Sequence, residues 1–158
     1  MSNNEQSWAV ITGASSGIGK CMAIELASRG YNVIVTARRE SRLTDLCQLI
    51  AEKYGREAKA VPNDLSNPEG AKMLVDEINK LGIKPSILIN NAGKGHFGPF
   101  TEFSLEDHQG DIQLNISSLV SLTYQMIPLL EQAKGPLWLK PYSAVRYNHQ
   151  FRQKIQNY

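Results

Sequence analysis

The stretch from Thr12 to Gly19 carries the residue types and the spacing that bind phosphate groups. It reads Thr-Gly-Ala-Ser-Ser-Gly-Ile-Gly, follows a short apolar run at residues 8–11 and leads into a helical pattern of apolar residues. Glycines let a backbone turn tightly and approach a phosphate, and the N-terminus of the next helix offers unpaired N–H groups and the positive end of its dipole. The stretch therefore predicts a cradle for a dinucleotide pyrophosphate. The alternative is a glycine-rich turn that binds no ligand.

Two adjacent arginines lie at the position where a dinucleotide-binding domain contacts the adenosine ribose. Arg38 and Arg39 follow an apolar, β-branched run at residues 31–37, and Arg38 comes about 20 residues after Gly19. An acidic residue at this place accepts hydrogen bonds from the ribose 2′-hydroxyl of NAD, whereas an arginine accommodates the 2′-phosphate of NADP. We therefore expect NADP(H), with NAD(H) as the weaker candidate. The alternative is that both arginines are solvated loop charges.

Further polar residues follow two other apolar runs. Asp64 comes after the run at residues 58–61, and Asn90-Asn91-Ala92-Gly93 directly follows the run at residues 86–89. A carboxylate at Asp64 can accept a hydrogen bond from an adenine amino group, but a lone acid is more often a turn residue. The asparagines can support a loop through side-chain-to-backbone hydrogen bonds, a role that is compatible with cofactor contact.

These apolar runs alternate four times with helical patterns. We expect one helix directly after Gly17, one capped by Ser41, one from about Pro68, and a long one from Ser104 or Leu105 to about Gln132. Parallel strands require helical crossovers, and right-handed crossovers give a doubly wound sheet whose ligands bind outside the carboxyl ends of the strands. The sequence therefore predicts an α/β, Rossmann-like doubly wound parallel sheet, truncated after about the fifth strand, with four strand ends converging on one crevice.

The pattern changes after Gly135. Leu137-Trp138-Leu139 can form a fifth strand that Pro141 ends early, and the residues beyond it are basic and rich in Asn and Gln. A short amphipathic helix and a loosely attached tail are both compatible with that composition. We expect residues 1–135 to form an NAD(P)-binding Rossmann-like domain and residues 136–158 to be a divergent basic tail, foreign to the fold.

Composition limits the classes of function. The 17 basic and 15 acidic residues are interspersed and give a net charge of +2, which indicates neither nucleic-acid nor membrane binding. Residues 1–5 form no charged-then-apolar leader, no apolar run reaches about 18 residues, and the expected location is cytoplasmic. Cys21 and Cys47 are expected to be buried, reduced thiols. The histidines are widely spaced, so no metal site is expected, and His96 is expected to be a polar loop residue.

Taken together, the motifs resemble those of the short-chain dehydrogenase/reductase family. The glycine-rich stretch, Asn63-Asp64-Leu65, Asn90-Asn91-Ala92-Gly93 and Leu114-Asn115 stand in that family's order and spacing over about residues 7–135. The resemblance implies an NADP(H)-dependent oxidoreductase that transfers hydride between nicotinamide and a small-molecule carbonyl or alcohol substrate. A homo-oligomer is compatible with it. An unrelated doubly wound domain, flavodoxin-like or receiver-like, is the remaining fold alternative.

The resemblance also assigns roles to residues. Asn115 matches the asparagine of the family's catalytic tetrad, which helps to hold a water in the proton relay; an Asn in mid-helix otherwise needs a local reason. The loop from Lys94 to Phe100 would line one side of the substrate pocket. The positions implied or expected to bind the cofactor are Gly13, Ser15, Ser16, Gly17, Ile18, Gly19, Arg38, Arg39, Asp64, Leu65, Asn91, Ala92 and Gly93.

The sequence departs from the family in the catalytic motif. Family members use a Ser on the fifth strand and a Tyr-x-x-x-Lys, in which the Tyr is the general acid/base and the ammonium lowers its pKa. Tyr142-Ser-Ala-Val-Arg146 imitates this motif too early and with Arg, which does not readily release a proton. Ser143 remains as the candidate for the substrate-orienting Ser. The alternative function is therefore a catalytically inactive NADP(H)-binding or interaction module.

Overall fold

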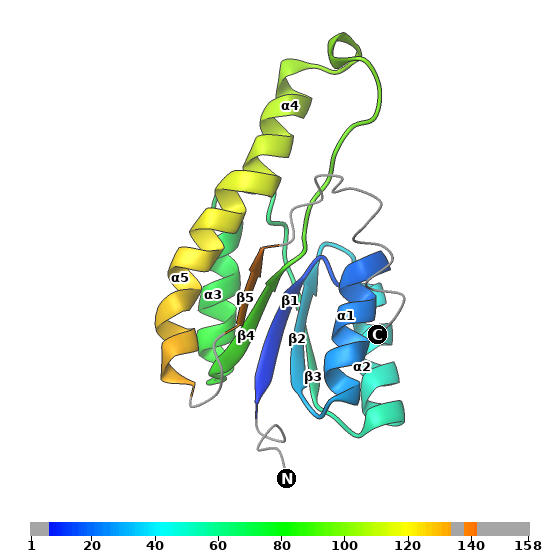
Figure 1. Ribbon diagram of the computed structural model, residues 1–158, viewed down its shortest axis with the longest axis vertical. Helices are drawn as coiled ribbons and strands as arrows, with labels where there is room; N and C mark the ends of the chain where they lie inside the picture. Colours follow the sequence, from blue (N-terminus) through cyan, green and yellow to red (C-terminus); the bar gives the residue numbers. More distant parts are fainter. Residues whose placement is uncertain (1–6, 134–137, 142–158) are drawn as a thin grey trace.

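A computed structural model describes residues 7–133 and 138–141 of the chain (Figure 1). The described residues form one parallel sheet with the strand order β3-β2-β1-β4-β5. Its strands are β1 (Trp8–Thr12), β2 (Asn32–Ala37), β3 (Ala58–Pro62), β4 (Pro85–Asn90) and β5 (Trp138–Pro141). The first crossovers add strands on one side of β1 and the later ones on the other side, so the predicted doubly wound sheet is confirmed.

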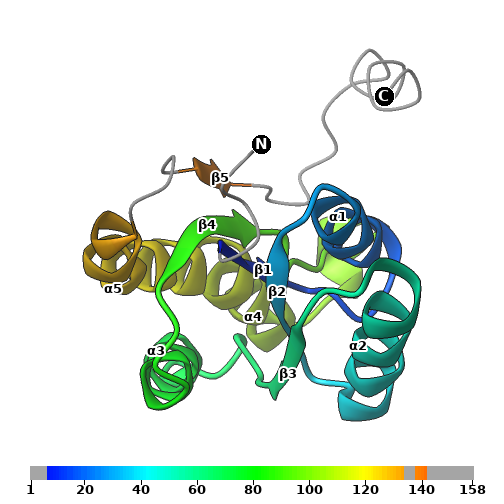
Figure 2. The same cartoon turned by 90° about the horizontal axis from the view of Figure 1, so that it is seen from below.

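Helices cover both faces of the sheet (Figure 2). On one face, α1 (Gly17–Ser28) and α2 (Glu40–Tyr54) pack against a core that includes Ile11 and Val35. On the other face, α3 (Gly70–Lys80) and α5 (Ser118–Gln132) pack against Val10 and Leu88. Burial on both faces explains why the central strands β1, β2 and β4 are mostly apolar runs rather than alternating patterns.

The central strand brings the chemistry-bearing strand ends together. β1 pairs in parallel with β2, where Thr12 lies opposite Thr36, and with β4, where Ile11 lies opposite Ile89. The carboxyl ends of these three strands therefore meet at one edge of the sheet. The residues that follow each strand, from Gly13, Arg38 and Asn91 onward, emerge at that edge.

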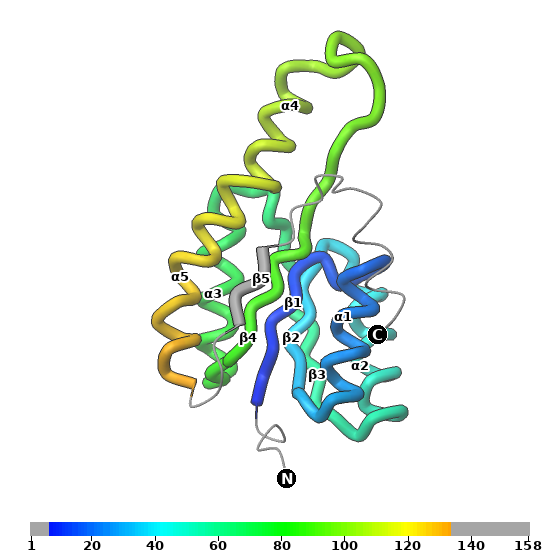
Figure 3. Tube along the Cα trace, viewed as in Figure 1, coloured from blue at the N-terminus to red at the C-terminus, as the bar shows by residue number. Residues whose placement is uncertain are grey.

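The chain after β4 leaves the sheet and returns as a helix (Figure 3). A short turn η2 (Phe100–Glu102) precedes α4 (Leu105–Ile112), which continues through the π-helical segment η3 (Gln113–Ser117) into α5. Ser104 begins α4 with a reciprocal capping box to Asp107. The predicted extent of this long helix is confirmed, but five of its residues are π-helical rather than α-helical.

Two helices start at residues other than those predicted. α2 begins at Glu40, not after Ser41, because Arg39 is the last extended residue after β2. α3 begins at Gly70 because the turn bonds from Asn67 N–H to Asp64 O and from Gly70 N–H to Asn67 O delay the helix beyond Pro68.

The thiols are less buried than predicted. Cys21 is exposed because it lies on the solvent side of α1, whereas Ala23 and Ala27 face the core. Cys47 is partly buried, and burial raises the pKa of its thiol against the opposing charge of Lys59. Among the helices that the structure describes, none has the length and apolar content needed to cross a membrane.

Candidate functional site

The glycine-rich turn after β1 leaves no room for a side chain at Gly13 or Gly19. Gly13 has a positive φ of 66°, and a Cβ there would lie 2.9 Å from both Ala92 Cα and Asn91 Nδ2. A Cβ on Gly19 would overlap the Gly13 carbonyl oxygen and the Asn91 amide. The turn and the first turn of α1 therefore lie directly against the end of β4, as a close backbone approach requires.

The N-terminus of α1 has backbone N–H groups that are free of a side-chain cap. Ser16 occupies the N-cap position in an extended conformation, and its side chain makes no capping hydrogen bond. The N–H groups of the first helical turn consequently lack the side-chain acceptor that usually satisfies them. Ile18, in that turn, is 49% exposed. Together with the tight turn, these features fit the pyrophosphate of a dinucleotide.

Thr12 joins the glycine-rich turn to the segment after β4. Its hydroxyl oxygen accepts hydrogen bonds from the N–H groups of Asn91 and Ala92, both at 2.9 Å, and its hydroxyl donates to Ile89 O at 3.4 Å. The Asn91 side-chain amide donates to Thr12 O at 3.0 Å and to Gly13 O at 3.3 Å. The predicted loop-supporting role of this asparagine is thus confirmed.

We expect Thr12→Val to destabilise the protein. The substitution keeps the shape of the side chain but leaves two N–H groups without an acceptor, which should lower the free energy of unfolding by about 2 kcal/mol. Urea denaturation measures the change.

Thr36→Val is the matched control, because the Thr36 hydroxyl is equally buried, lies in register on the neighbouring strand and has no hydrogen-bond partner among the described residues. This variant should be neutral or slightly stabilising. Equal losses in the two variants would show that the hydroxyl bonds of Thr12 contribute nothing to stability.

Arg39, rather than Arg38, contacts the glycine-rich turn. One of its guanidinium nitrogens, Nη2, donates to Ser15 Oγ at 3.0 Å and to Ser16 Oγ at 2.9 Å. Arg38 is exposed at the end of β2, and its charge contributes to lowering the pKa of Asp64. The structure thus places the Arg39 guanidinium and two serine hydroxyls beside the N-terminus of α1, a donor set suited to a phosphate monoester, and Arg38 precedes Arg39 directly in the chain.

Asp64 is a turn residue at the end of β3. Its Oδ1 accepts hydrogen bonds from the backbone N–H and the hydroxyl of Ser66. Partial burial raises the pKa of this carboxyl, but the two Ser66 bonds and the charges of Arg38 and Lys94 outweigh that effect and hold it below its ordinary value. Its neighbour Leu65 is buried at 8% exposure. The structure thus shows the turn role that the sequence left as an alternative.

The lowered pKa of Asp64 predicts a pH dependence. Its ionised form contributes stability that is present above the ordinary pKa of about 3.9 and is lost as the pH falls through the lower, folded-state value. The difference in unfolding free energy between the wild type and Asp64→Asn should therefore shrink as the pH is lowered from about 6 towards 3. Urea titrations at a series of pH values measure it; a difference independent of pH would contradict the assignment.

Asn115 lies in the π-helical segment and holds the chain after Gly93. Its Oδ1 accepts from Lys94 N–H at 3.0 Å, and its Nδ2 donates to Lys94 O at 2.6 Å. This two-point bond to a backbone is the local reason that the sequence required for an asparagine in mid-helix. π-helical turns of this kind occur frequently at functional sites.

The loop beyond Lys94 presents aromatic side chains. Phe97 is 84% exposed and Phe100 75% exposed. The Phe100 ring stacks on His108 at 3.9 Å between centroids, and the His108 Nε2–H donates to Phe100 O at 3.0 Å. Ser143, the sequence's candidate for the substrate-orienting residue, lies outside the described residues.

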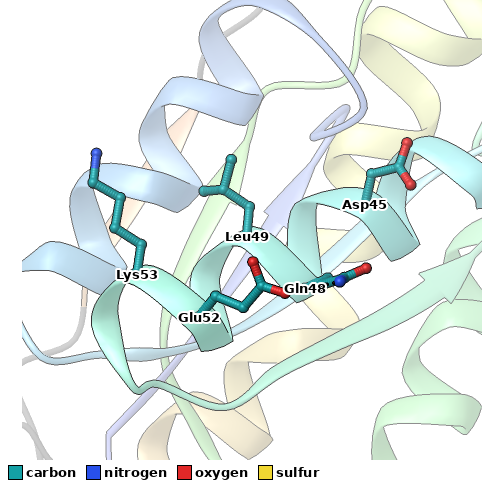
Figure 4. Close-up of a pocket in the computed structure, with 5 residues that line it drawn as sticks. All are labelled: Asp45, Gln48, Leu49, Glu52 and Lys53. Atoms are coloured by element: carbon teal, nitrogen blue, oxygen red, sulfur yellow. Dashed lines mark hydrogen bonds between the residues drawn. The ribbon is translucent and has the colours of Figure 1, made fainter.

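A surface hollow of about 340 Å³ lies elsewhere, along the exposed side of α2 (Figure 4). Its described lining is the side chains Asp45, Gln48, Leu49, Glu52 and Lys53. None of these residues belongs to the strand ends where the predicted site residues meet. The hollow is therefore separate from the candidate site.

A parallel sheet with a glycine-rich turn opening its first helix defines the class of Rossmann-like α/β domains. The sequence model of the short chain dehydrogenases matches residues 7–137. The chain belongs to this family, and the flavodoxin-like or receiver-like alternative is excluded.

Curated relatives extend the comparison. A very-long-chain 3-oxoacyl-CoA reductase of Scheffersomyces stipitis is 38% identical over 129 residues, which are 79% of this chain and 37% of the relative. A reductase of the same name from Aspergillus clavatus is 38% identical over 141 residues, covering 84% of this chain and 39% of the relative. The chain therefore spans about two fifths of the length of these relatives.

Solved structures share the fold. A short-chain dehydrogenase of Sphingobium yanoikuyae in complex with NADPH has a TM-score of 0.72 and 32% identity, covering 77% of this chain and 47% of that one. L-sorbose reductase of Gluconobacter frateurii, complexed with NADPH and L-sorbose, has a TM-score of 0.76 and 31% identity over 80% of this chain and 48% of that one. An alcohol dehydrogenase of Thermococcus sibiricus complexed with 5-hydroxy-NADP has a TM-score of 0.77 and 27% identity over 86% and 62% of the two chains.

Proposed function

We propose that this chain is the cofactor-binding portion of an NADP(H)-dependent oxidoreductase that interconverts a carbonyl and an alcohol. The observation that carries the proposal is the donor set at the end of β2, where Arg39 bonds Ser15 and Ser16 beside the open N-terminus of α1. NADP-bound solved relatives support the choice of cofactor. When bound, NADP(H) would supply or accept the hydride.

The residues have separable tasks in this proposal. The turn from Gly13 to Gly19 receives the pyrophosphate through backbone N–H groups, and Arg38 and Arg39 receive the 2′-phosphate. Asp64 and Leu65 flank the adenine, while Asn91 to Gly93 support the adenosine ribose. Asn115 holds the backbone of Lys94 and, by the family resemblance, a water of the proton relay.

Very-long-chain 3-oxoacyl-CoA thioesters are the favoured substrate class. The curated relatives at 38% identity carry that substrate in their names. Phe97 and Phe100, both strongly exposed on the loop that follows β4, are aromatic surfaces of the kind that an acyl chain would cover. A polar sugar, such as the L-sorbose bound by the sorbose reductase, would gain little binding energy from these aromatic surfaces.

An inactive NADP(H)-binding module is the second candidate. No Tyr-x-x-x-Lys occurs in the printed sequence, and Tyr142 is followed four residues later by Arg146. Without the paired ammonium, a tyrosine keeps its ordinary, high pKa and is a poor general acid near neutral pH. This reading predicts cofactor binding without turnover.

Titration with NADPH and with NADH tests both candidates. Energy transfer from tryptophan to the nicotinamide reports the binding. Micromolar binding with NADPH preferred supports the cofactor proposal, while equal affinities would remove the 2′-phosphate role of the arginines. Adding a very-long-chain 3-oxoacyl-CoA to the NADPH complex then separates the two functions. Loss of NADPH absorbance would show that this chain itself reduces the substrate, and its absence with binding intact would show that this chain only binds the cofactor.

A further inference from the structure

Three charged or titratable groups gather between the loop after β4 and α4. Lys94 Nζ lies 3.4 Å from Asp111 Oδ1, and the His96 ring nitrogen Nδ1 lies 2.9 Å from Asp111 Oδ2. An ionised carboxylate only accepts hydrogen bonds, so this ring nitrogen carries a proton and donates it. One side chain on the helix thus holds two side chains of the loop.

The cluster is partly buried and well packed. The Asp111 side chain is only 20% exposed. The His96 ring lies against Phe103 with 4.6 Å between centroids. Burial raises the pKa of Asp111, but the bonds from His96 and Lys94 outweigh it and hold the pKa below its ordinary value. The carboxylate therefore stays ionised near neutral pH and keeps both partners.

Lys94 connects this cluster to Asn115. Its backbone N–H and C=O both bond the Asn115 side chain, while its own side chain crosses the helix to reach Asp111. The Lys94 side chain passes over Gly110, where an added Cβ would lie 3.1 Å from Lys94 Nζ. Lys94 is consequently fixed at three atoms to one helical surface, and Asp111 and Asn115 stand one turn apart on it.

We propose that Asp111 is a positioning residue, which fixes the backbone of Lys94 and thereby the orientation of the Asn115 amide. The proposal rests on the proposed function only for the role of Asn115 in the proton relay. The mechanical link itself depends on the contacts between Lys94, Asp111 and Asn115. It assigns a task to a carboxylate outside the sequence motifs.

Amide hydrogen exchange tests this link. It is measured residue by residue with NMR on the full chain without cofactor. Asp111→Asn should raise the exchange rate of the Lys94 amide at least tenfold, because this N–H is donated to Asn115 Oδ1. Lys94→Met should give the same increase by removing the ammonium, and the double variant should add nothing further, as expected for two partners in one interaction. Amides within α5, such as that of Met126, should keep their protection.

Asp76→Asn is the control, since it breaks a surface ion pair with Lys72 that has an N–O distance of 2.9 Å and lies on α3. It should leave the Lys94 amide unchanged. Unchanged Lys94 exchange in Asp111→Asn would overturn the proposal, and so would a general rise throughout α4 and α5, which would indicate a helix-stabilising role instead. Neither result depends on NADPH binding, so failure here is distinct from failure of the proposed function.

Discussion

Gly19→Ala is expected to weaken NADPH binding at least a hundredfold, a loss of about 2.8 kcal/mol. The added methyl group would overlap the Gly13 carbonyl oxygen and the Asn91 side-chain amide. The turn would have to move away from β4, and the backbone N–H groups at the start of α1 would lose their common direction. Fluorescence titration measures the affinity, and circular dichroism checks that the sheet remains formed.

Gly55→Ala is the control for Gly19→Ala, because it strains the backbone without bringing the added methyl group close to any other atom. Gly55 has a positive φ of 61° after the end of α2, but nothing lies within 4 Å of a Cβ built there. The variant should lose about 1 kcal/mol of stability and keep its affinity for NADPH. If Gly19→Ala bound NADPH as tightly as the wild type, the pyrophosphate site would not lie at this turn.

Removing both Arg38 and Arg39 is expected to abolish the preference for NADPH over NADH. A hydrogen bond to a charged group contributes about 1.5–3 kcal/mol, so the double alanine variant should bind NADPH roughly a hundredfold more weakly and NADH about as before. Arg39→Ala alone tests the contacts to Ser15 and Ser16, and Arg38→Ala alone tests the family's usual position. Parallel titrations with the two cofactors measure the change in preference.

Arg42→Ala provides the charge control for each single variant, because it likewise removes one positive charge, from an exposed position near the start of α2. Its effect on NADPH should be small and should disappear at high salt, as for a distant charge. A loss of affinity for both cofactors in the double variant would contradict a specific contact with the 2′-phosphate.

The sequence predicted the features whose causes are local. A tight turn requires glycine at Gly13, and burial on both faces requires continuous apolar strands, so both could be inferred without coordinates. The position of Asn115 predicted a special local role, because an asparagine in a helix interior is unfavourable. The order of the elements and the convergence of the strand ends followed from the same patterns.

Features that depend on tertiary contact escaped prediction. Adjacent arginines at the end of a strand are equivalent in sequence, and only the fold decides that Arg39 contacts the glycine-rich turn. The contact of His96 with Asp111 spans 15 positions and depends on how the loop folds back on α4. The π-helical segment has no sequence signature of its own. The exposure of Cys21 depends on which side of α1 faces the sheet.

The central place of β1 also constrains the order in which the protein can assemble during translation. β1 pairs with β2 on one edge and with β4 on the other, and the Thr12–Ile89 contact joins positions 77 residues apart, so the second edge of β1 can be paired only after β4 has been synthesised. Throughout that interval the first strand of the nascent chain has an unpaired edge, which can pair with other chains. The glycine-rich turn is synthesised early, but the hydrogen bonds that it receives from Asn91 can form only after the fourth strand has been made.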